Sequence, residues 1–217
     1  TVPIPETHPK NPESPYGLSK WCFEELLRVF DKSEGIRSVS LRYFNASGAS
    51  LSGTHCEAHA SETHIIPLAI KTAMGVQKEF LLYGTDYPTR DGSCERDFIH
   101  NEDLCKAHII ALDALMNGHK TDAYNVATGN GVTNKELVSQ VKKTSGVDFA
   151  VKEVGRRSGD PGILVADPTK LKKEFGWSPK YSDLATIVGN AWKWHRSHPA
   201  GYKSKAPNSK SKISLKT

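Results

Sequence analysis

The chain has 217 residues, of which 37% are hydrophobic and 24% charged, with a net charge of +5. This composition excludes a chain disordered throughout and is typical of one globular domain or two small ones. Residues 1–15 lack the cationic start and apolar core of a signal peptide, and no apolar run reaches the roughly 18 residues of a membrane span, which predicts a cytoplasmic protein with no membrane partner.

The first predicted helix begins after Ser14 and Pro15, a suitable N-cap and first helical residue. Apolar side chains recur at helical spacing from Trp21 to Phe30, and Gly35 ends the pattern. The β-branched and aromatic "SVSLRYF" then predicts a buried strand over residues 38–44. A long polar loop follows over residues 46–63, a length that is often functional.

Helices and strands alternate over the rest of the chain. Helices are predicted at "IIPLAIKTAMG", residues 102–116, "KELVSQVKKTSG", "TKLKKEFG" and residues 184–195. Strands are predicted at "EFLLYG", "DFIH", "DAYNVATG" and "DFAVKEV". Thr133 and Glu136 have capping-box spacing. The alternation predicts an α/β fold.

The basic character of the chain is confined to its C-terminal end. Residues 203–217 carry five lysines and no acidic residue, which leaves 24 basic and 24 acidic side chains in residues 1–202. Such a lysine- and serine-rich segment predicts a disordered tail, and weak electrostatic contact with RNA or a membrane is the alternative. We therefore expect no nucleic-acid partner.

The four cysteines, Cys22, Cys56, Cys94 and Cys105, form no C-x-x-C pair, so we expect reduced thiols and neither a zinc ribbon nor a disulfide scaffold. The segment "HCEAHASETH" is the alternative metal-binding candidate. The spacing of its potential ligands His55, Cys56, His59 and His64 fits no recognised zinc pattern. The sequence therefore predicts no metal site.

Tyr16 and Lys20 are four residues apart on the first turns of the predicted helix, so they share one face. A neighbouring positive charge favours the phenolate, the form of tyrosine that accepts a proton. The alternative is a partly buried aromatic residue beside a solvated lysine. The motif alone is too short to decide between them.

Several ordered motifs change that balance, because together they resemble the nucleotide-sugar epimerases of the extended short-chain dehydrogenase/reductase family. The resemblance covers almost all of residues 1–202. It rests on "SPYGLSK", "LRYFNASGA", "ETHIIPLAIKTAMG", "YGTDYPTRDGSCERDFIH", "YNVATGNGVT", "RRSGDP" and "FGWSPKY".

The resemblance implies NAD-dependent epimerisation at C4 of a UDP-hexose, such as UDP-galactose, through a transient 4-keto sugar. Tyr16 would take the proton from the sugar 4-hydroxyl, and Lys20 would bind the nicotinamide ribose. Tyr43 or Phe44 would lie against the nicotinamide end of NAD, and Asn45 near the sugar or phosphate of the substrate. Packing within the strand is the alternative for the two aromatic rings.

The resemblance also places the UDP-sugar substrate. Arg96, Arg157 and Asp160 match positions that hold the diphosphate and ribose, where guanidinium groups suit phosphate oxygens, and a surface ion pair is the alternative. The backbone of Leu81, Leu82 and Tyr83 would pack on the uracil. His64 and Ile65 replace the Asn-Leu of many members at the sugar diphosphate, and Leu164 matches a position associated with acceptance of N-acetylated sugars.

The implied fold is the C-terminal part of a Rossmann-type NAD-binding domain plus a smaller mixed α/β substrate-binding domain. Residues 1–46 and about 97–118 would belong to the first domain, and residues 47–96 and 119–202 to the second. The glycine-rich dinucleotide fingerprint does not occur in residues 1–20, so we expect that the chain is truncated.

Family members are commonly homodimers through helices of the cofactor domain, with Trp21, Phe23 and Leu27 as candidate contacts here. Other functions stay open: a UDP-arabinose or UDP-glucuronate 4-epimerase, a dehydratase, a decarboxylase, or a non-catalytic nucleotide-sugar binding remnant.

Overall fold

The computed structural model describes residues 1–59 and 61–201, and the predicted basic tail, residues 203–217, lies outside the described residues. Three pairs of parallel strands form its framework: β1 (Val39–Tyr43) with β6 (Asp122–Val126), β2 (Asn45–Ser47) with β5 (Phe98–His100), and β3 (Phe80–Tyr83) with β8 (Val151–Val154). These parallel pairs and the helices between them confirm the predicted α/β class. Within the described residues, no helix is both long and apolar enough to cross a membrane.

The first helix, α1 (Pro15–Glu34), has the ends that its sequence predicts. The Ser14 hydroxyl accepts a hydrogen bond from the Gly17 amide at 3.1 Å, and Gly35 ends the helix in the left-handed conformation with φ 68°. Every residue of α1 is at least partly exposed in the described part of the chain. The helix therefore presents apolar side chains such as Phe23 and Val29 to solvent, 59% exposed each.

In the described part of the chain, five further helices follow in chain order. They are α2 (Ile65–Ala73), α3 (Asn101–Met116), α4 (Asn134–Ser145), α5 (Thr169–Phe175) and α6 (Leu184–Ser197). Helix α4 begins with the predicted capping box, in which Thr133 and Glu136 exchange side-chain-to-backbone hydrogen bonds. Helix α6 extends two residues beyond its predicted end, to Ser197, whose hydroxyl donates to the Trp194 carbonyl at 2.9 Å.

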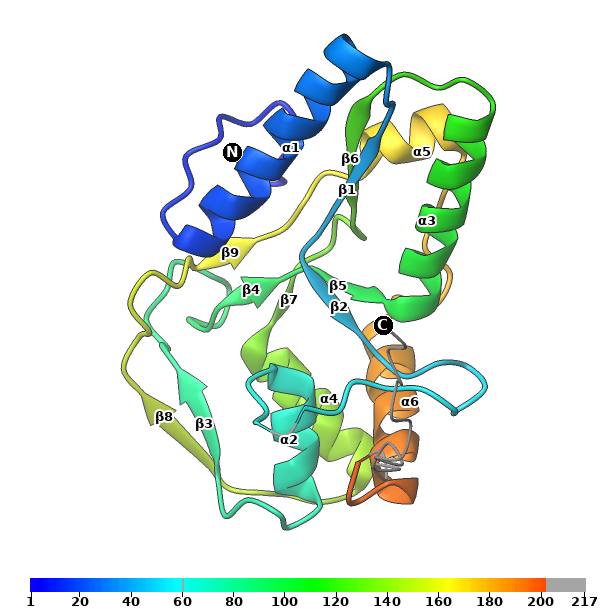
Figure 1. Ribbon diagram of the computed structural model, residues 1–217. Coiled ribbons are helices and arrows are strands. Elements are labelled where there is room, and N and C mark those ends of the chain that lie inside the picture. Colours follow the sequence, from blue (N-terminus) through cyan, green and yellow to red (C-terminus); the bar gives the residue numbers. More distant parts are fainter. Residues whose placement is uncertain (60, 202–217) are drawn as a thin grey trace, which may run out of the picture.

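Within the described residues, two hydrophobic clusters hold these elements together. In the lower half of Figure 1, α2, β3, α4 and α6 pack around residues such as Ile70 and Leu137. In the upper half, β1, β6, α3 and α5 surround Tyr124 and Leu171. Strand β5 connects the two clusters, because adjacent strand residues face opposite sides and Phe98 lies in the first cluster while Ile99 lies in the second.

A small three-stranded sheet, not predicted from the sequence, lies between the two clusters. Strand β4 (Glu95–Arg96) pairs antiparallel with β7 (Val132–Thr133) and parallel with β9 (Ile163–Leu164). Strands of two residues leave no periodicity in a sequence, so only their distant partners define them.

The predicted division into two domains stays a prediction. The pairing of β1 with β6 joins residues 122–126 to the part of the chain assigned to the NAD-binding domain. The sequence-based boundary instead places these residues in the substrate domain. The structure groups residues 122–126 with β1 because β6 forms a parallel pair with β1, five residues long in each strand, and the β6 side chains pack against α3 and α5.

Candidate functional site

One cavity, of about 660 Å³, lies between α1, β1 and residues 4–12. It gathers four of the sequence-predicted residues: Tyr16 and Lys20 from α1, and Tyr43 and Phe44 from the end of β1. Ile4 and Pro5 of the N-terminal segment also line the cavity. The segment is held in place because Ile4 bridges to Ala166 and Glu6 accepts a hydrogen bond from the Asn125 amide at 2.8 Å. The four predicted cofactor contacts are therefore brought to one cavity.

Tyr16 and Lys20 lie one turn apart, as their spacing predicts. The Lys20 ammonium lies 5.2 Å from the centre of the Tyr16 ring, within the range of a cation–π contact. The Tyr16 side chain is 73% exposed, so its hydroxyl is accessible to a ligand. The alternative prediction of a partly buried aromatic residue does not describe this side chain.

A helix-to-strand ion pair fixes α1 against β1 beside this cavity. The Arg42 guanidinium donates to the Glu24 carboxylate through Nε at 2.7 Å and through Nη2 at 2.5 Å. This bidentate pair raises the pKa of Arg42, and the partner guanidinium holds the pKa of Glu24 below its usual value despite burial. The pair therefore joins the helix that carries Tyr16 to the strand that ends at Tyr43.

A second group of predicted residues gathers around β4 and β9. Arg96 and Leu164 are paired residues in these strands. The Arg96 guanidinium donates through Nη2 to the Asp160 carboxylate and through Nη1 to the Glu95 carbonyl at 3.0 Å. The structure thus joins the predicted residues of "ERDFIH" and "RRSGDP" by an ion pair, 11% exposed on the arginine side.

Arg157 and Tyr83 form the neighbouring part of this group. The Arg157 guanidinium stacks 3.9 Å from the centre of the Tyr83 ring. Leu81 and Leu82 precede Tyr83 in β3, where Leu81 is 39% exposed and Leu82 is buried in the core. Strand β3 therefore exposes the Leu81 side chain while the Leu82 side chain anchors the strand.

Asp97, which sequence reasoning missed, connects the two groups. Its carboxylate accepts hydrogen bonds from the Thr128 amide at 2.9 Å, the Thr128 hydroxyl at 2.7 Å and the Gly129 amide at 3.0 Å. Its backbone carbonyl accepts from the Asn45 side chain at 3.0 Å, and its amide donates to Leu164. Asn45 directly follows Phe44, so Asp97 ties the cavity beside α1 to the Arg96 group. Burial raises the pKa of Asp97, and the hydrogen bonds oppose that rise.

His64 is the N-cap residue of α2 and Ile65 is its first residue. The exposed His64 ring faces two acids, with Nδ1 2.6 Å from Glu57 Oε1 and 3.2 Å from Glu62 Oε1. Among the described residues, the His64 side chain makes no hydrogen bond or ion pair with Asn45, Arg96 or Arg157.

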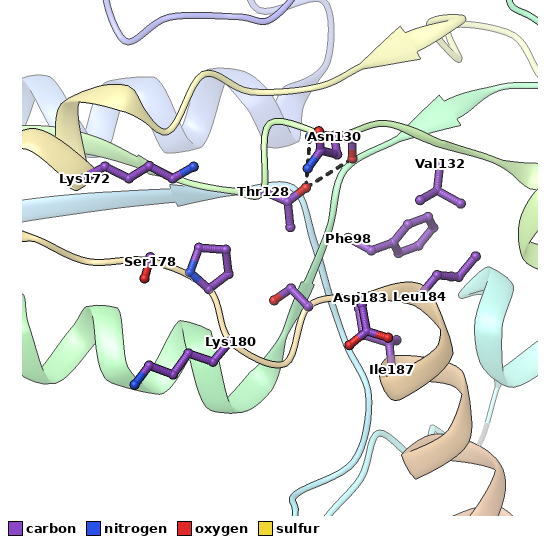
Figure 2. A pocket seen from close by; sticks show the side chains of 12 residues that line it. Phe98, Thr128, Asn130, Val132, Lys172, Ser178, Lys180, Asp183, Leu184 and Ile187 are labelled. Carbon is purple, nitrogen blue, oxygen red and sulfur yellow. Dashed lines mark hydrogen bonds between the residues drawn. The ribbon is translucent and has the colours of Figure 1, made fainter.

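Another cavity, of about 470 Å³, opens between β5, the turn at Thr128 and the start of α6 (Figure 2). Figure 2 shows Lys172 and Lys180 at one side and the apolar Phe98, Leu184 and Ile187 at the other. Among the described residues, its lining includes none of the sequence-predicted site residues.

The fold and the two groups of residues define an α/β protein with Rossmann-type parallel strand pairs. A family model described as GDP-mannose 4,6 dehydratase matches residues 1–188. The chain belongs to this family.

Individual relatives carry another name. The chain is 44% identical over 204 residues to the UDP-glucose 4-epimerase of Lactobacillus helveticus, covering 94% of this chain and 62% of that protein. A solved UDP-glucose 4-epimerase from Brucella ovis in complex with NAD is 40% identical with a TM-score of 0.86, covering 89% of this chain and 59% of that one. The enzyme from Bifidobacterium longum in complex with NAD+ and UDP is 33% identical with a TM-score of 0.85, covering 93% and 61%.

The chain thus spans about three fifths of the length of these relatives, between 59% and 62%. These similarities confirm the resemblance to nucleotide-sugar epimerases that the motifs predict.

Proposed function

We propose that the chain forms part of an NAD-dependent enzyme that inverts C4 of a UDP-hexose, interconverting UDP-galactose and UDP-glucose. The observation that carries the proposal is the shared cavity of Tyr16, Lys20, Tyr43 and Phe44, tied through Asp97 to Arg96. The solved relatives with NAD+ and UDP support it.

The residues around the cavity fit the nicotinamide end of NAD. Aromatic side chains at Tyr43 and Phe44 offer flat apolar surface, and Lys20 offers N–H donors for ribose hydroxyls. When bound, NAD supplies the exchange of the C4 hydride that the protein's own side chains lack.

The proposed chemistry of the chain's own residues begins with proton transfer. Tyr16 accepts the proton of the sugar 4-hydroxyl, and the Lys20 ammonium lies one helical turn away, 5.2 Å from the centre of the Tyr16 ring. Arg157 has an exposed guanidinium stacked on Tyr83, so its N–H donors are available to a diphosphate. Arg96 in β4 adds positive charge, and Asp160 both orients Arg96 and offers a carboxylate oxygen to a ribose hydroxyl.

Asn45, His64 and Ile65 are proposed to contact the sugar and its diphosphate. The backbone of Leu81, Leu82 and Tyr83 is proposed to pack on the uracil. Leu164 in β9 pairs with Arg96 in β4, and its side-chain size is proposed to decide whether an N-acetyl group is accepted.

A homodimer is proposed through α1. Trp21 and Phe23 are 37% and 59% exposed on this helix. Burial of such side chains against a second copy would release apolar surface from water, at about 25 cal/mol per Å². Sedimentation of a Phe23→Glu variant tests this assembly, and an unchanged dimer fraction contradicts it.

The proposed activity is tested with a chimera in which this chain replaces the matching part of the Lactobacillus helveticus relative. Conversion of UDP-galactose is measured with added NAD+, beside UDP-arabinose, UDP-glucuronate and GDP-mannose. The proposal predicts the fastest turnover with UDP-galactose. A folded chimera that prefers another sugar nucleotide, or forms a dehydrated or decarboxylated product, favours the corresponding alternative. A folded chimera that binds UDP-sugars without turnover favours a non-catalytic binding protein.

A further inference from the structure

Three side chains near the start of α2 form a compact cluster. Glu57 Oε1 lies 2.6 Å from His64 Nδ1 and 2.9 Å from His59 Nε2. The two imidazole rings lie side by side, with their centres 5.4 Å apart. All three ligand-capable atoms fall within 4.8 Å of one another.

Two imidazole nitrogens and a carboxylate oxygen form a donor set typical of Zn²⁺. Ligand atoms around a tetrahedral Zn²⁺ are about 3.3 Å apart when each bond is near 2.0–2.1 Å. The two histidines are 53% and 59% exposed, so their rings are free to turn by the small amounts that this spacing requires. Three protein ligands leave a fourth position for water.

A second carboxylate, that of Glu62, lies buried beside His64. Its side chain is 2% exposed, and its Oε1 accepts the backbone amides of Thr63 and His64 at 2.9 Å each. Its Oε2 is buried and has no hydrogen-bond partner among the described residues. A buried carboxylate oxygen without a partner is costly unless a positive charge or a donor compensates it. This oxygen belongs to the carboxylate that contacts His64 Nδ1.

Local charge decides whether a cation is tolerated at this position. The N-terminus of α2 carries a partial positive charge that disfavours a cation. The carboxylates of Glu57 and Glu62 carry two full negative charges beside it, which outweigh the partial charge of about +0.5 at a helix end.

We propose that Glu57, His59 and His64 bind a divalent transition-metal ion of the Zn²⁺ class, with Glu62 as a charge partner beside it. The sequence predicts no metal site here because its candidate ligands are His55, Cys56, His59 and His64, whose spacing fits no recognised zinc pattern. Glu57 is not among those candidates. In the structure, His55 Nδ1 instead contacts the Thr54 hydroxyl at 2.7 Å. His64 is also proposed above to contact the sugar diphosphate, but the zinc measurements need neither substrate nor turnover, so failure of the metal proposal is distinguishable from failure of the proposed function.

Zinc binding to the untagged, full 217-residue chain tests the proposal. A fluorescent zinc indicator competes with the protein for ZnCl₂, and one ion per chain is expected. His64→Ala and Glu57→Gln each lower the affinity about tenfold or more, because each removes one of three ligands. His55→Ala is the matched control from the same loop and leaves the affinity unchanged. Mg²⁺ at equal concentration does not compete, because it prefers oxygen ligands.

Co²⁺ provides a second readout of the same ligands. Bound Co²⁺ gives visible absorption that depends on its donor atoms, and this absorption is lost in His59→Ala but kept in His55→Ala. Circular dichroism without metal verifies that the variants are folded, as expected for exposed histidines. The absence of one-to-one Zn²⁺ binding, or equal binding by the parent chain and His64→Ala, overturns the proposal.

Discussion

The carboxylate of Asp103 is fully buried and holds the segment that leads into α6. Its Oδ1 accepts the Lys180 amide at 2.9 Å, and its Oδ2 accepts the Tyr181 amide and the Ser182 hydroxyl at 2.7 Å each. Lys180 and Ser182 also line the cavity of Figure 2. Asp103→Asn keeps the size of the side chain and removes its charge, so it isolates the value of these bonds.

The magnitude follows from the geometry. The single amide oxygen of asparagine can accept the Tyr181 and Ser182 donors, and its NH₂ group then faces the Lys180 N–H. One hydrogen bond to a charged acceptor is lost, at about 1.5–3 kcal/mol, and two others become neutral, at roughly 0.5–1 kcal/mol each. We expect the free energy of unfolding to fall by about 2.5–5 kcal/mol. This corresponds to a drop in Tm of roughly 10 °C for a chain of this size.

Urea denaturation followed by circular dichroism measures this loss. Asp113→Asn is the control, because Asp113 is exposed on the same helix and its substitution should change stability by no more than about 0.5 kcal/mol. A loss below about 1 kcal/mol for Asp103→Asn refutes the reasoning, since one unpaired donor alone exceeds it.

Three further outcomes follow from the structure. Burial lowers the pKa of His100, so His100 of the unfolded chain takes up a proton first as the pH falls below about 6.5, and stability is lost toward pH 5. His100→Asn should make this loss smaller in urea titrations at several pH values. An unchanged pH dependence contradicts the assignment to His100. Burial raises the pKa of Cys56 to about 12, so iodoacetamide at pH 8 should label the exposed Cys22 first by mass spectrometry, and equal labelling rates would be inconsistent with that burial. Gly92 has φ +83°, and an added Cβ would lie 2.2 Å from the Thr85 carbonyl oxygen; Gly92→Ala therefore costs about 2–4 kcal/mol, and a neutral result in urea denaturation argues against this turn.

Local signals in the sequence predict the helices well. The caps of α1 at Ser14 and Gly35, and the capping box at Thr133, arise from hydrogen bonds between residues a few positions apart. The alternation of these helices with apolar strands predicts the parallel α/β arrangement. Such information is present in any window of the chain, so no tertiary contact is needed to read it.

Contacts between distant residues could not be predicted in the same way. Asp97 lies between the short strands β4 and β5, and its partners Thr128 and Gly129 are more than 30 positions away. The Arg96–Asp160 ion pair spans 64 positions; the family resemblance names both residues as substrate contacts but does not predict that they pair with each other. The contact of Glu57 with two histidines depends on how an irregular loop folds, which spacing alone does not encode.

Turnover by the Tyr16→Phe variant of the chimera tests the central claim most directly. Phenylalanine keeps the ring and removes only the hydroxyl proposed to accept the proton. We predict that kcat for conversion of UDP-galactose to UDP-glucose falls about 100-fold or more, while KM changes little, because general-base contributions are about 10²–10⁴. Equal kcat in the Tyr16 and Phe variants would contradict the role of this residue and the account built on it.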